Sequence, residues 1–128
     1  MAGAKVFAIA NQKGGVGKTT TTINLAACLA DAGRRTLVID LDPQSNTTTH
    51  LGVDAHRVGT SIYEILVDSS IPVASVVKQE LRPNLALLPA KVDLYAAEIE
   101  LVYLDQREYR LRRAIDQVRD QYDFVLID

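Results

Sequence analysis

Short apolar runs alternate with longer amphipathic stretches along this chain. Four runs have the length of a buried strand, at residues 5–10, 36–39, 85–88 and 124–127. Helices are predicted at residues 19–31, 61–67, 72–79 and 94–104, and from 105 to about 122. Nearly continuous apolar runs are typical of parallel strands that are buried on both faces. Strands that alternate with helices predict the α/β class, with a doubly wound, mostly parallel sheet and flanking helices.

The last helix has the clearest periodicity. Its apolar positions follow the i, i+3, i+4, i+7 spacing of one buried face, and they are Leu111, Ala114, Ile115, Val118 and Tyr122. Arginines occupy the rest of its surface, namely Arg107, Arg110, Arg112, Arg113 and Arg119. A solvated helix face is the favoured interpretation, and a nucleic-acid or partner surface is the alternative. The polar stretch 41–59 predicts a loop region that contains short helical pieces.

Composition narrows the class of protein. The chain has 128 residues, of which 48% are hydrophobic and 23% charged, and this favours one globular domain. A formal net charge of −2 gives no global basic excess of the kind that marks a nucleic-acid binder. The single cysteine, Cys28, excludes an internal disulfide and a two-cysteine metal motif. We expect Cys28 to be a small buried side chain in a helix. The chain has no signal-peptide pattern or membrane-spanning run, so a cytoplasmic location is expected.

A glycine-rich segment between the first strand and the first helix indicates phosphate binding. Glycines 14, 15 and 17 allow backbone N–H groups to approach a ligand closely, and the helix that follows adds its positive N-terminal end. Lys18 can reach the β- and γ-phosphates, and the Thr19 hydroxyl is placed to bind Mg²⁺. The alternative is a glycine-rich turn that binds nothing.

Acidic residues follow two of the strands. Asp40 ends the second strand, Asp42 lies two residues further on, and Asp128 ends the last strand. In an open α/β sheet these groups and the glycine loop meet at the carboxyl edge, where ligands bind. Phosphoryl transfer to water needs one group to orient the nucleophile and another to hold the metal shell. Taken alone, Asp40 could be a strand-end turn residue and Asp42 a loop cap.

Residues 11–20, NQKGGVGKTT, resemble the deviant phosphate loop of the ParA/Soj/MinD ATPases, a family with the P-loop NTPase fold. The first position is Gln12 where the standard pattern has Gly, and Lys13 is an additional lysine. The resemblance implies that Lys13 reaches across a nucleotide-sandwich dimer to the phosphates of the partner. It also implies that Asp42 positions the attacking water, that Asp40 supports Mg²⁺, and that Asp128 is the Walker B acid.

The resemblance therefore assigns a complete site. The nucleotide-binding residues are Lys13, Gly14, Gly15, Val16, Gly17, Lys18, Thr19 and Thr20; the catalytic residues are Asp42, Lys13 and Lys18; the metal residues are Thr19, Asp40 and Asp128. The implied cofactors are ATP and Mg²⁺. The similarity extends to residues 45–48, although the family often has Gly at the position of Ser45.

The family's biology supplies further expectations, closest to the chromosome-partitioning ParA/Soj branch. Its members form ATP-dependent homodimers, bind DNA non-specifically, are stimulated by a ParB/Spo0J-like activator, and act in chromosome or plasmid segregation. The resemblance implies a cytoplasmic, nucleoid-associated ATPase with no membrane partner.

Length is the departure, because family members are about twice as long. Residues 1–128 are expected to form the N-terminal portion of a single P-loop ATPase domain, with the DNA-binding surface in the missing half. We expect the terminal strand to leave an uncovered sheet edge. Weak or no ATP turnover is expected from these residues alone.

Three alternatives stay open. A MinD-like, membrane-cycling ATPase shares the phosphate loop, but the Asp-Pro-Gln segment at 42–44 favours the Soj branch. The nitrogenase iron-protein branch requires cluster-ligating cysteines, for which Cys28 is a poor candidate. A non-hydrolytic, nucleotide-dependent interaction module is the alternative from outside the enzymes.

Overall fold

A computed structural model describes residues 3–9, 15–42, 44–92 and 107–128. Within them, five strands form one sheet in the order β1-β5-β2-β4-β3. The strands are β1 (Lys5–Ala8), β2 (Thr36–Ile39), β3 (Lys78–Arg82), β4 (Leu85–Leu88) and β5 (Phe124–Ile127). β1, β5, β2 and β4 run parallel to one another, whereas the edge strand β3 is antiparallel to β4. The predicted α/β class and mostly parallel sheet are confirmed.

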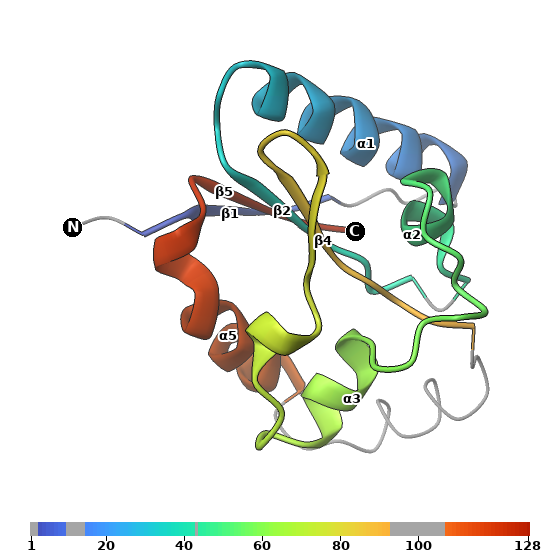
Figure 1. Cartoon of the computed structure of the whole chain (residues 1–128), viewed down its shortest axis with the longest axis vertical. Coiled ribbons are helices and arrows are strands. Elements are labelled where there is room, and N and C mark those ends of the chain that lie inside the picture. The colour runs from blue at the N-terminus through green and yellow to red at the C-terminus, as the bar shows by residue number, and fades with distance from the viewer. Residues whose placement is uncertain (1–2, 10–14, 43, 93–106) are drawn as a thin grey trace.

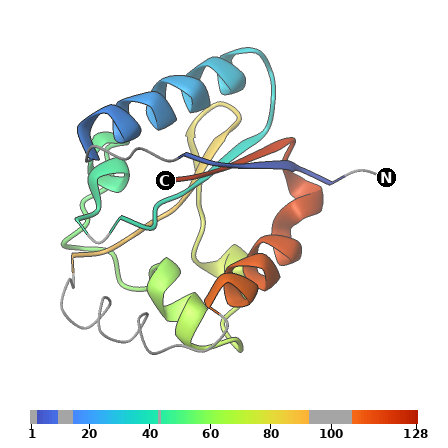
Figure 2. The ribbon, with the colours of Figure 1, turned by 180° about the vertical axis from the view of Figure 1, so that it is seen from behind.

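Helices cover both faces of the sheet (Figures 1 and 2). α1 (Gly15–Asp31) and α2 (Asn46–His50) lie on one face, and α3 (Ile62–Val67) and α5 (Arg107–Val118) lie on the other. Successive side chains along each strand point to opposite faces of the sheet, so one strand can pack against the helices on both faces. Val38 and Leu126 pack in the cluster that contains Ala26 of α1, whereas Leu37 and Val125 pack in the cluster that contains Ile115 of α5.

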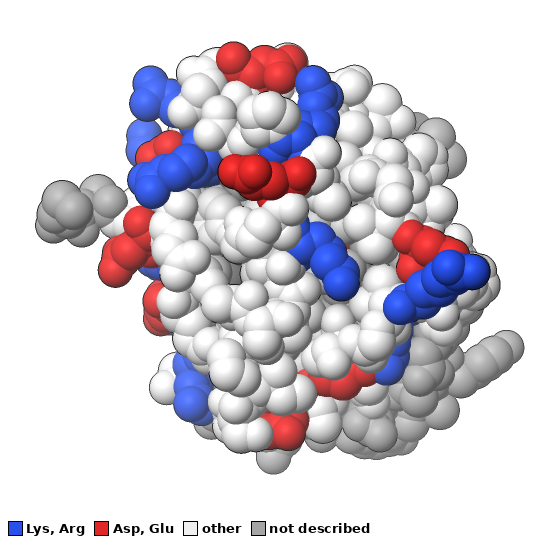
Figure 3. Space-filling view, in the orientation of Figure 1, with Lys and Arg blue, Asp and Glu red and all other residues white. Residues whose placement is uncertain are grey.

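The amphipathic face predicted for the last helix is confirmed. Ala114, Ile115, Val118 and Tyr122 are each at most 7% exposed, and Leu111 packs partly buried against the same cluster. Arg112 and Arg113 are exposed, as expected of a solvated helix face. Acidic and basic side chains are interspersed on the face shown in Figure 3, which shows no large patch of one sign. A single 3₁₀ turn, Arg119–Gln121, joins α5 to β5.

The helix predicted at residues 72–79 is wrong. Pro72 precedes one 3₁₀ turn, Val73–Ser75, and the chain then enters the edge strand β3. Asn84 lies in the turn between β3 and β4 with a φ of 68°, a left-handed conformation that Asn tolerates. α3 starts one residue inside its prediction, because Ser61 is its N-cap and forms a capping box with Glu64. The helix predicted at 94–104 and the first two residues predicted for the last helix, 105 and 106, lie outside the described residues.

Two expectations about burial are also wrong. All four residues of β1 are exposed, because its sheet neighbour in the described part of the chain is β5 alone. The two edges of the described sheet are β1 and β3, whereas the terminal strand β5, expected to leave an uncovered edge, lies inside the sheet. Cys28 is exposed rather than buried. It lies two positions from each of the buried Ala26 and Ala30, and therefore on the opposite side of α1.

Candidate nucleotide-binding site

The parallel register brings the ends of β1, β2 and β5 together. Ile39 pairs with Ile127, which in turn pairs with Ala8. Backbone hydrogen bonds continue past the strands: Asp128 donates to the Ile39 carbonyl at 2.9 Å, and Leu41 donates to the Asp128 carbonyl at 2.7 Å. Asp40 and Asp128 consequently lie on adjacent strand ends, at the carboxyl edge where a ligand site was predicted.

Helix α1 begins within the predicted phosphate loop. Gly15 and Val16 are its first two residues, and Lys18 and Thr19 follow in the first turns. Lys18 is half-buried, Thr19 is buried, and Gly17 and Thr20 are exposed. Because the amide groups of a first helical turn have no partner within the helix, this end of α1 can bind an anion. The predicted residues Lys13 and Gly14 lie outside the described part of the chain.

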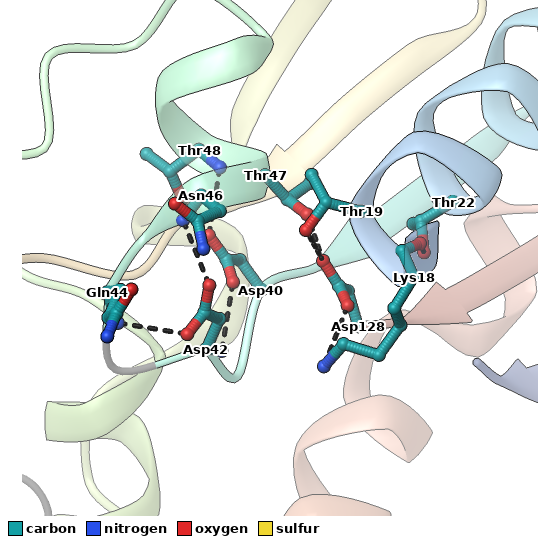
Figure 4. Close-up of polar contacts among 10 residues, drawn as sticks. All are labelled: Lys18, Thr19, Thr22, Asp40, Asp42, Gln44, Asn46, Thr47, Thr48 and Asp128. Carbon is teal, nitrogen blue, oxygen red and sulfur yellow. Dashed lines mark hydrogen bonds and ion pairs between the residues drawn. The ribbon is translucent and has the colours of Figure 1, made fainter. Parts of the chain in front are cut away.

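Asp128 joins the phosphate-loop residues to the sheet edge (Figure 4). Its carboxylate lies 3.0 Å from the Lys18 ammonium through Oδ1, and 3.4 Å from the Thr19 hydroxyl through Oδ2. Oδ2 also accepts a hydrogen bond from the hydroxyl of Thr47 in α2. Oδ1 is buried and accepts no directional hydrogen bond from the described residues, so the Lys18 contact is an ion pair. The structure thus brings together Lys18, Thr19 and Asp128, three of the predicted site residues.

Asp40 is completely buried and points toward α2. Its Oδ2 accepts hydrogen bonds from the Thr48 backbone N–H at 2.8 Å and from the Thr48 hydroxyl at 2.6 Å, and its Oδ1 accepts from the Asp42 N–H at 2.9 Å. Burial raises the pKa of Asp40, and the Thr48 hydrogen bonds oppose that rise. In this geometry Asp40 anchors α2 to the end of β2.

Asp42 is half-buried and is bonded to its own loop. Its Oδ1 accepts from the Gln44 N–H at 3.0 Å, and its Oδ2 accepts from the Asn46 N–H at 3.2 Å. It therefore binds the first backbone N–H of α2, in keeping with the alternative interpretation of Asp42 as a loop cap. A carboxylate has about four acceptor positions, so these two bonds leave Asp42 able to accept a further proton donor such as water.

Two functional candidates, Thr47 and Thr48, were missed as site residues. Both are completely buried, and they bond to Asp128 and Asp40 respectively. The Thr48 hydroxyl also accepts a hydrogen bond from the Ala90 N–H at 3.0 Å, which ties α2 to the end of β4. Two adjacent threonines soon after an acidic pair were the available signal, but their partners depend on tertiary contacts.

The backbone conformation of Ser45 explains why the family that the sequence resembles often has glycine at this position. Its φ of 59° and ψ of 34° are left-handed, a conformation that costs a residue with a Cβ atom about 1–2 kcal/mol. The Ser45 hydroxyl is buried and has no hydrogen-bond partner among the described residues. Glycine would avoid both costs.

The side chains at this edge fit Mg²⁺. Thr19 and Asp128 supply oxygen ligands, the type that Mg²⁺ prefers, and Oδ1 of Asp128 is a buried acceptor without a hydrogen bond. Within the described residues, no group of three or more His, Cys, Asp or Glu side chains could hold a metal ion. Mg²⁺ commonly binds through one or two protein oxygens together with phosphate and water, so the sparse set is compatible with it.

A helix that starts on a glycine loop, with its lysine and threonine facing the acid of a neighbouring parallel strand, defines the P-loop nucleotide triphosphatases. Comparison with known proteins gives the family. A model of the AAA domain family matches residues 4–128. Soj from Bacillus subtilis is 49% identical over 97% of this chain and 49% of its own length. ParA from Caulobacter vibrioides, a chromosome partitioning protein, is 49% identical over 97% of this chain and 47% of its own length.

A solved structure agrees with these matches. Cobyrinic acid a,c-diamide synthase from Mycobacterium smegmatis, with a bound ATP analogue and magnesium, has a TM-score of 0.86 and 40% identity, over 98% of this chain and 50% of its own. The chain belongs to the ParA/Soj/MinD family of P-loop ATPases with a deviant Walker A loop. It spans about half the length of the curated relatives it matches. None of the helices in its described part is both long and apolar enough to cross a bilayer.

Proposed function

We propose that this protein binds and hydrolyses ATP with Mg²⁺ and acts in chromosome or plasmid partition. The observation that carries the proposal is the cluster of Lys18, Thr19 and Asp128, in which a lysine and a hydroxyl from the start of α1 meet a buried carboxylate at the sheet edge. A lysine held beside an acid at a helix N-terminus is poised to exchange that acid for phosphate.

Nucleotide binding requires a rearrangement of this cluster. Lys18 would leave Asp128 and turn its ammonium toward the β- and γ-phosphates, while the N–H groups at the start of α1 bind the phosphate oxygens. Thr19 and Asp128 would hold Mg²⁺, with Asp128 acting through water. Bound Mg²⁺ neutralises charge on the phosphates and lowers the barrier to phosphoryl transfer.

Hydrolysis needs a group that orients water. We assign this role to Asp42, whose carboxylate keeps free acceptor positions while the Gln44 and Asn46 N–H groups fix its orientation. Asp40 is proposed to support the metal shell, and Lys13 to contact the phosphates of a second subunit. Gly14, Gly15, Val16, Gly17 and Thr20 complete the proposed nucleotide loop.

The cellular role is inferred from the relatives. ParA from C. vibrioides is named a chromosome partitioning protein, and this chain is 49% identical to it. By this kinship we propose an ATP-dependent homodimer, stimulation by a ParB-type activator, and non-specific DNA binding through a segment equivalent to the second half of the relatives. The role places the protein at the nucleoid.

The test separates binding from turnover in a full-length chimera. Residues 1–128 would replace the matching half of C. vibrioides ParA, and ATP binding and phosphate release would be measured with and without Mg²⁺. Asp42→Ala is expected to keep ATP binding and lose turnover by at least about tenfold, because only transition-state positioning is removed. Lys18→Ala is expected to lose both.

Two outcomes would reject the proposed hydrolytic role. If the chimera binds ATP without turnover, the protein is a nucleotide-dependent interaction module. If Asp42→Ala hydrolyses ATP at the unchanged rate, the nucleophile is oriented by another group. Unmodified ParA, measured in parallel, controls for the assay conditions.

A further inference from the structure

Thr47 is the partner of Asp128 that comes from outside the phosphate loop. It lies in α2, is completely buried, and donates its hydroxyl to Asp128 Oδ2 across 81 positions of sequence. Lys18 and Thr19, from α1, approach the same carboxylate at 3.0 and 3.4 Å. In Figure 4 the two threonine hydroxyls converge on one end of the carboxylate, while Lys18 meets the other. These three side chains are the partners of the carboxylate among the described residues.

Lys18, Thr19 and Thr47 differ in whether their contact with Asp128 must change when nucleotide binds. Lys18 must turn its ammonium to the phosphates, and this removes its ion pair with Asp128. The Thr19 hydroxyl can give a lone pair to Mg²⁺ while it still donates its proton to Asp128. Thr47 has no part in holding phosphate, so its contact with Asp128 can persist unchanged after Lys18 has turned away.

The segment that carries Thr47 is firmly attached to the site. The residue before it, Asn46, donates its backbone N–H to Asp42 Oδ2 at 3.2 Å. The residue after it, Thr48, bonds Asp40 Oδ2 through both its N–H, at 2.8 Å, and its hydroxyl, at 2.6 Å. Three successive residues of α2 therefore bond to the three acidic residues of the site. A hydroxyl on so constrained a segment can select one orientation of the carboxylate it binds.

We propose that Thr47 is a positioning residue for Mg²⁺: its hydroxyl holds the Asp128 carboxylate in the orientation that the metal shell requires once Lys18 has turned to the nucleotide. The inference rests on the proposed function. Thr47 touches neither metal nor nucleotide, and it acts through Asp128. Because the same segment binds Asp42, Thr47 also links the metal site to the loop of the proposed water-orienting residue.

The experiment measures Mg²⁺ dependence rather than activity. Binding of N-methylanthraniloyl-ATP to the 128-residue chain would be followed by fluorescence while Mg²⁺ is titrated, and again in EDTA. Thr47→Val keeps the side-chain shape and removes the hydroxyl. It is expected to raise the Mg²⁺ midpoint about tenfold or more, the usual effect of losing a hydrogen bond to a metal ligand. Binding in EDTA is expected to stay within about twofold of wild type, since Thr47 contacts no phosphate.

Two further variants separate positioning from a structural role. Thr47→Ser restores the hydroxyl and is expected to return the Mg²⁺ midpoint to within about twofold of wild type. Thr36→Val is the matched control, since Thr36 is also completely buried but donates to the Arg34 carbonyl at 3.0 Å, at the other end of β2. Its midpoint is expected to be unchanged. Thr47→Ala replaces Thr47→Val if the latter does not fold.

The outcomes distinguish the two proposals. An unchanged Mg²⁺ midpoint in Thr47→Val, beside Mg²⁺-dependent binding by wild type, overturns the role of Thr47 and leaves the proposed function standing. A Thr47→Ser midpoint as high as that of Thr47→Val also overturns it, because the hydroxyl would then not be the active group. Wild type without any Mg²⁺-dependent binding overturns both proposals.

Discussion

Replacing Ser45 with glycine should stabilise the protein. The structure contains two costs at this position: a left-handed backbone with φ of 59°, and a buried hydroxyl without a hydrogen-bond partner in the described part of the chain. Relief of the backbone strain contributes about 1–2 kcal/mol, and removal of the unsatisfied hydroxyl contributes about 1–3 kcal/mol. Glycine's greater freedom in the unfolded chain destabilises the folded state by about 0.5–1 kcal/mol, and the small void left by the side chain destabilises it by a similar amount. We expect a net gain of about 2 kcal/mol in the free energy of unfolding, the midpoint of these ranges.

Urea unfolding measures this gain as a rise in midpoint at unchanged slope. Ser45→Ala is the first control, because it removes the hydroxyl but keeps the left-handed strain, and it should gain less than Ser45→Gly. Asn84→Gly is the second control. Asn84 has a φ of 68°, but its side chain donates to the Ala30 carbonyl at 3.3 Å, so little or no gain is expected. The reasoning is refuted if Ser45→Gly is no more stable than wild type.

Three further predictions concern positions away from the site. Burial would raise the pKa of Glu64, but hydrogen bonds from Lys91 and Ser61 outweigh burial and lower the pKa below its ordinary value of 4.5. The ionised Glu64 carboxylate therefore stabilises the folded state above pH 4.5, and this stabilisation is lost as the pH falls through the folded-state pKa. Glu64→Gln should therefore cost about 1–2 kcal/mol at pH 7 and progressively less in acid unfolding series; a constant cost at all pH values would contradict this. Cys28 is exposed, so its thiol should react with Ellman's reagent in native buffer at nearly the rate seen in denaturant, and strong protection would show that it is buried. Phe7 is 46% exposed on the edge strand, so Phe7→Thr should cost less than about 1.5 kcal/mol and reduce self-association in light scattering; a loss above about 3 kcal/mol would place Phe7 in the core.

Strands were predicted most accurately from the sequence where burial on both faces produces an uninterrupted run of apolar residues. β2, β4 and β5 are apolar, lie inside the sheet and appear at the predicted residues, and the acids that follow β2 and β5 meet as parallel topology requires. β3 could not be found in the same way, because its Lys78–Arg82 sequence is mostly exposed and charged. Pro83 and Asn84 follow β3 and are residues that favour turns, so they were the available signal of a hairpin.

The errors have physical causes. An apolar run looks the same in sequence whether the strand lies at the edge or in the interior of a sheet. The exposure of β1 could not be predicted, because it depends on the position of β1 at the edge of the sheet. Cys28 was misjudged from the composition of its helix, although its phase relative to Ala26 and Ala30 would have placed it outside. Thr47 was missed because its role depends on contact with Asp128 across 81 positions of sequence. The assigned roles of Lys13, Asp40 and Asp42 stay predictions.

Mg²⁺-dependent nucleotide binding by the chain itself tests the central claim most directly. Equilibrium dialysis with radiolabelled ATP would compare wild type with Lys18→Ala, and with Lys5→Ala as a matched control, because Lys5 is exposed on β1 at the end of the sheet away from the site. We expect saturable binding by wild type and Lys5→Ala that EDTA weakens, and a loss of at least about tenfold in Lys18→Ala, in keeping with a charged hydrogen bond to phosphate. Equal binding by Lys18→Ala, or no binding by folded wild type, would contradict the assignment of this edge as a nucleotide site.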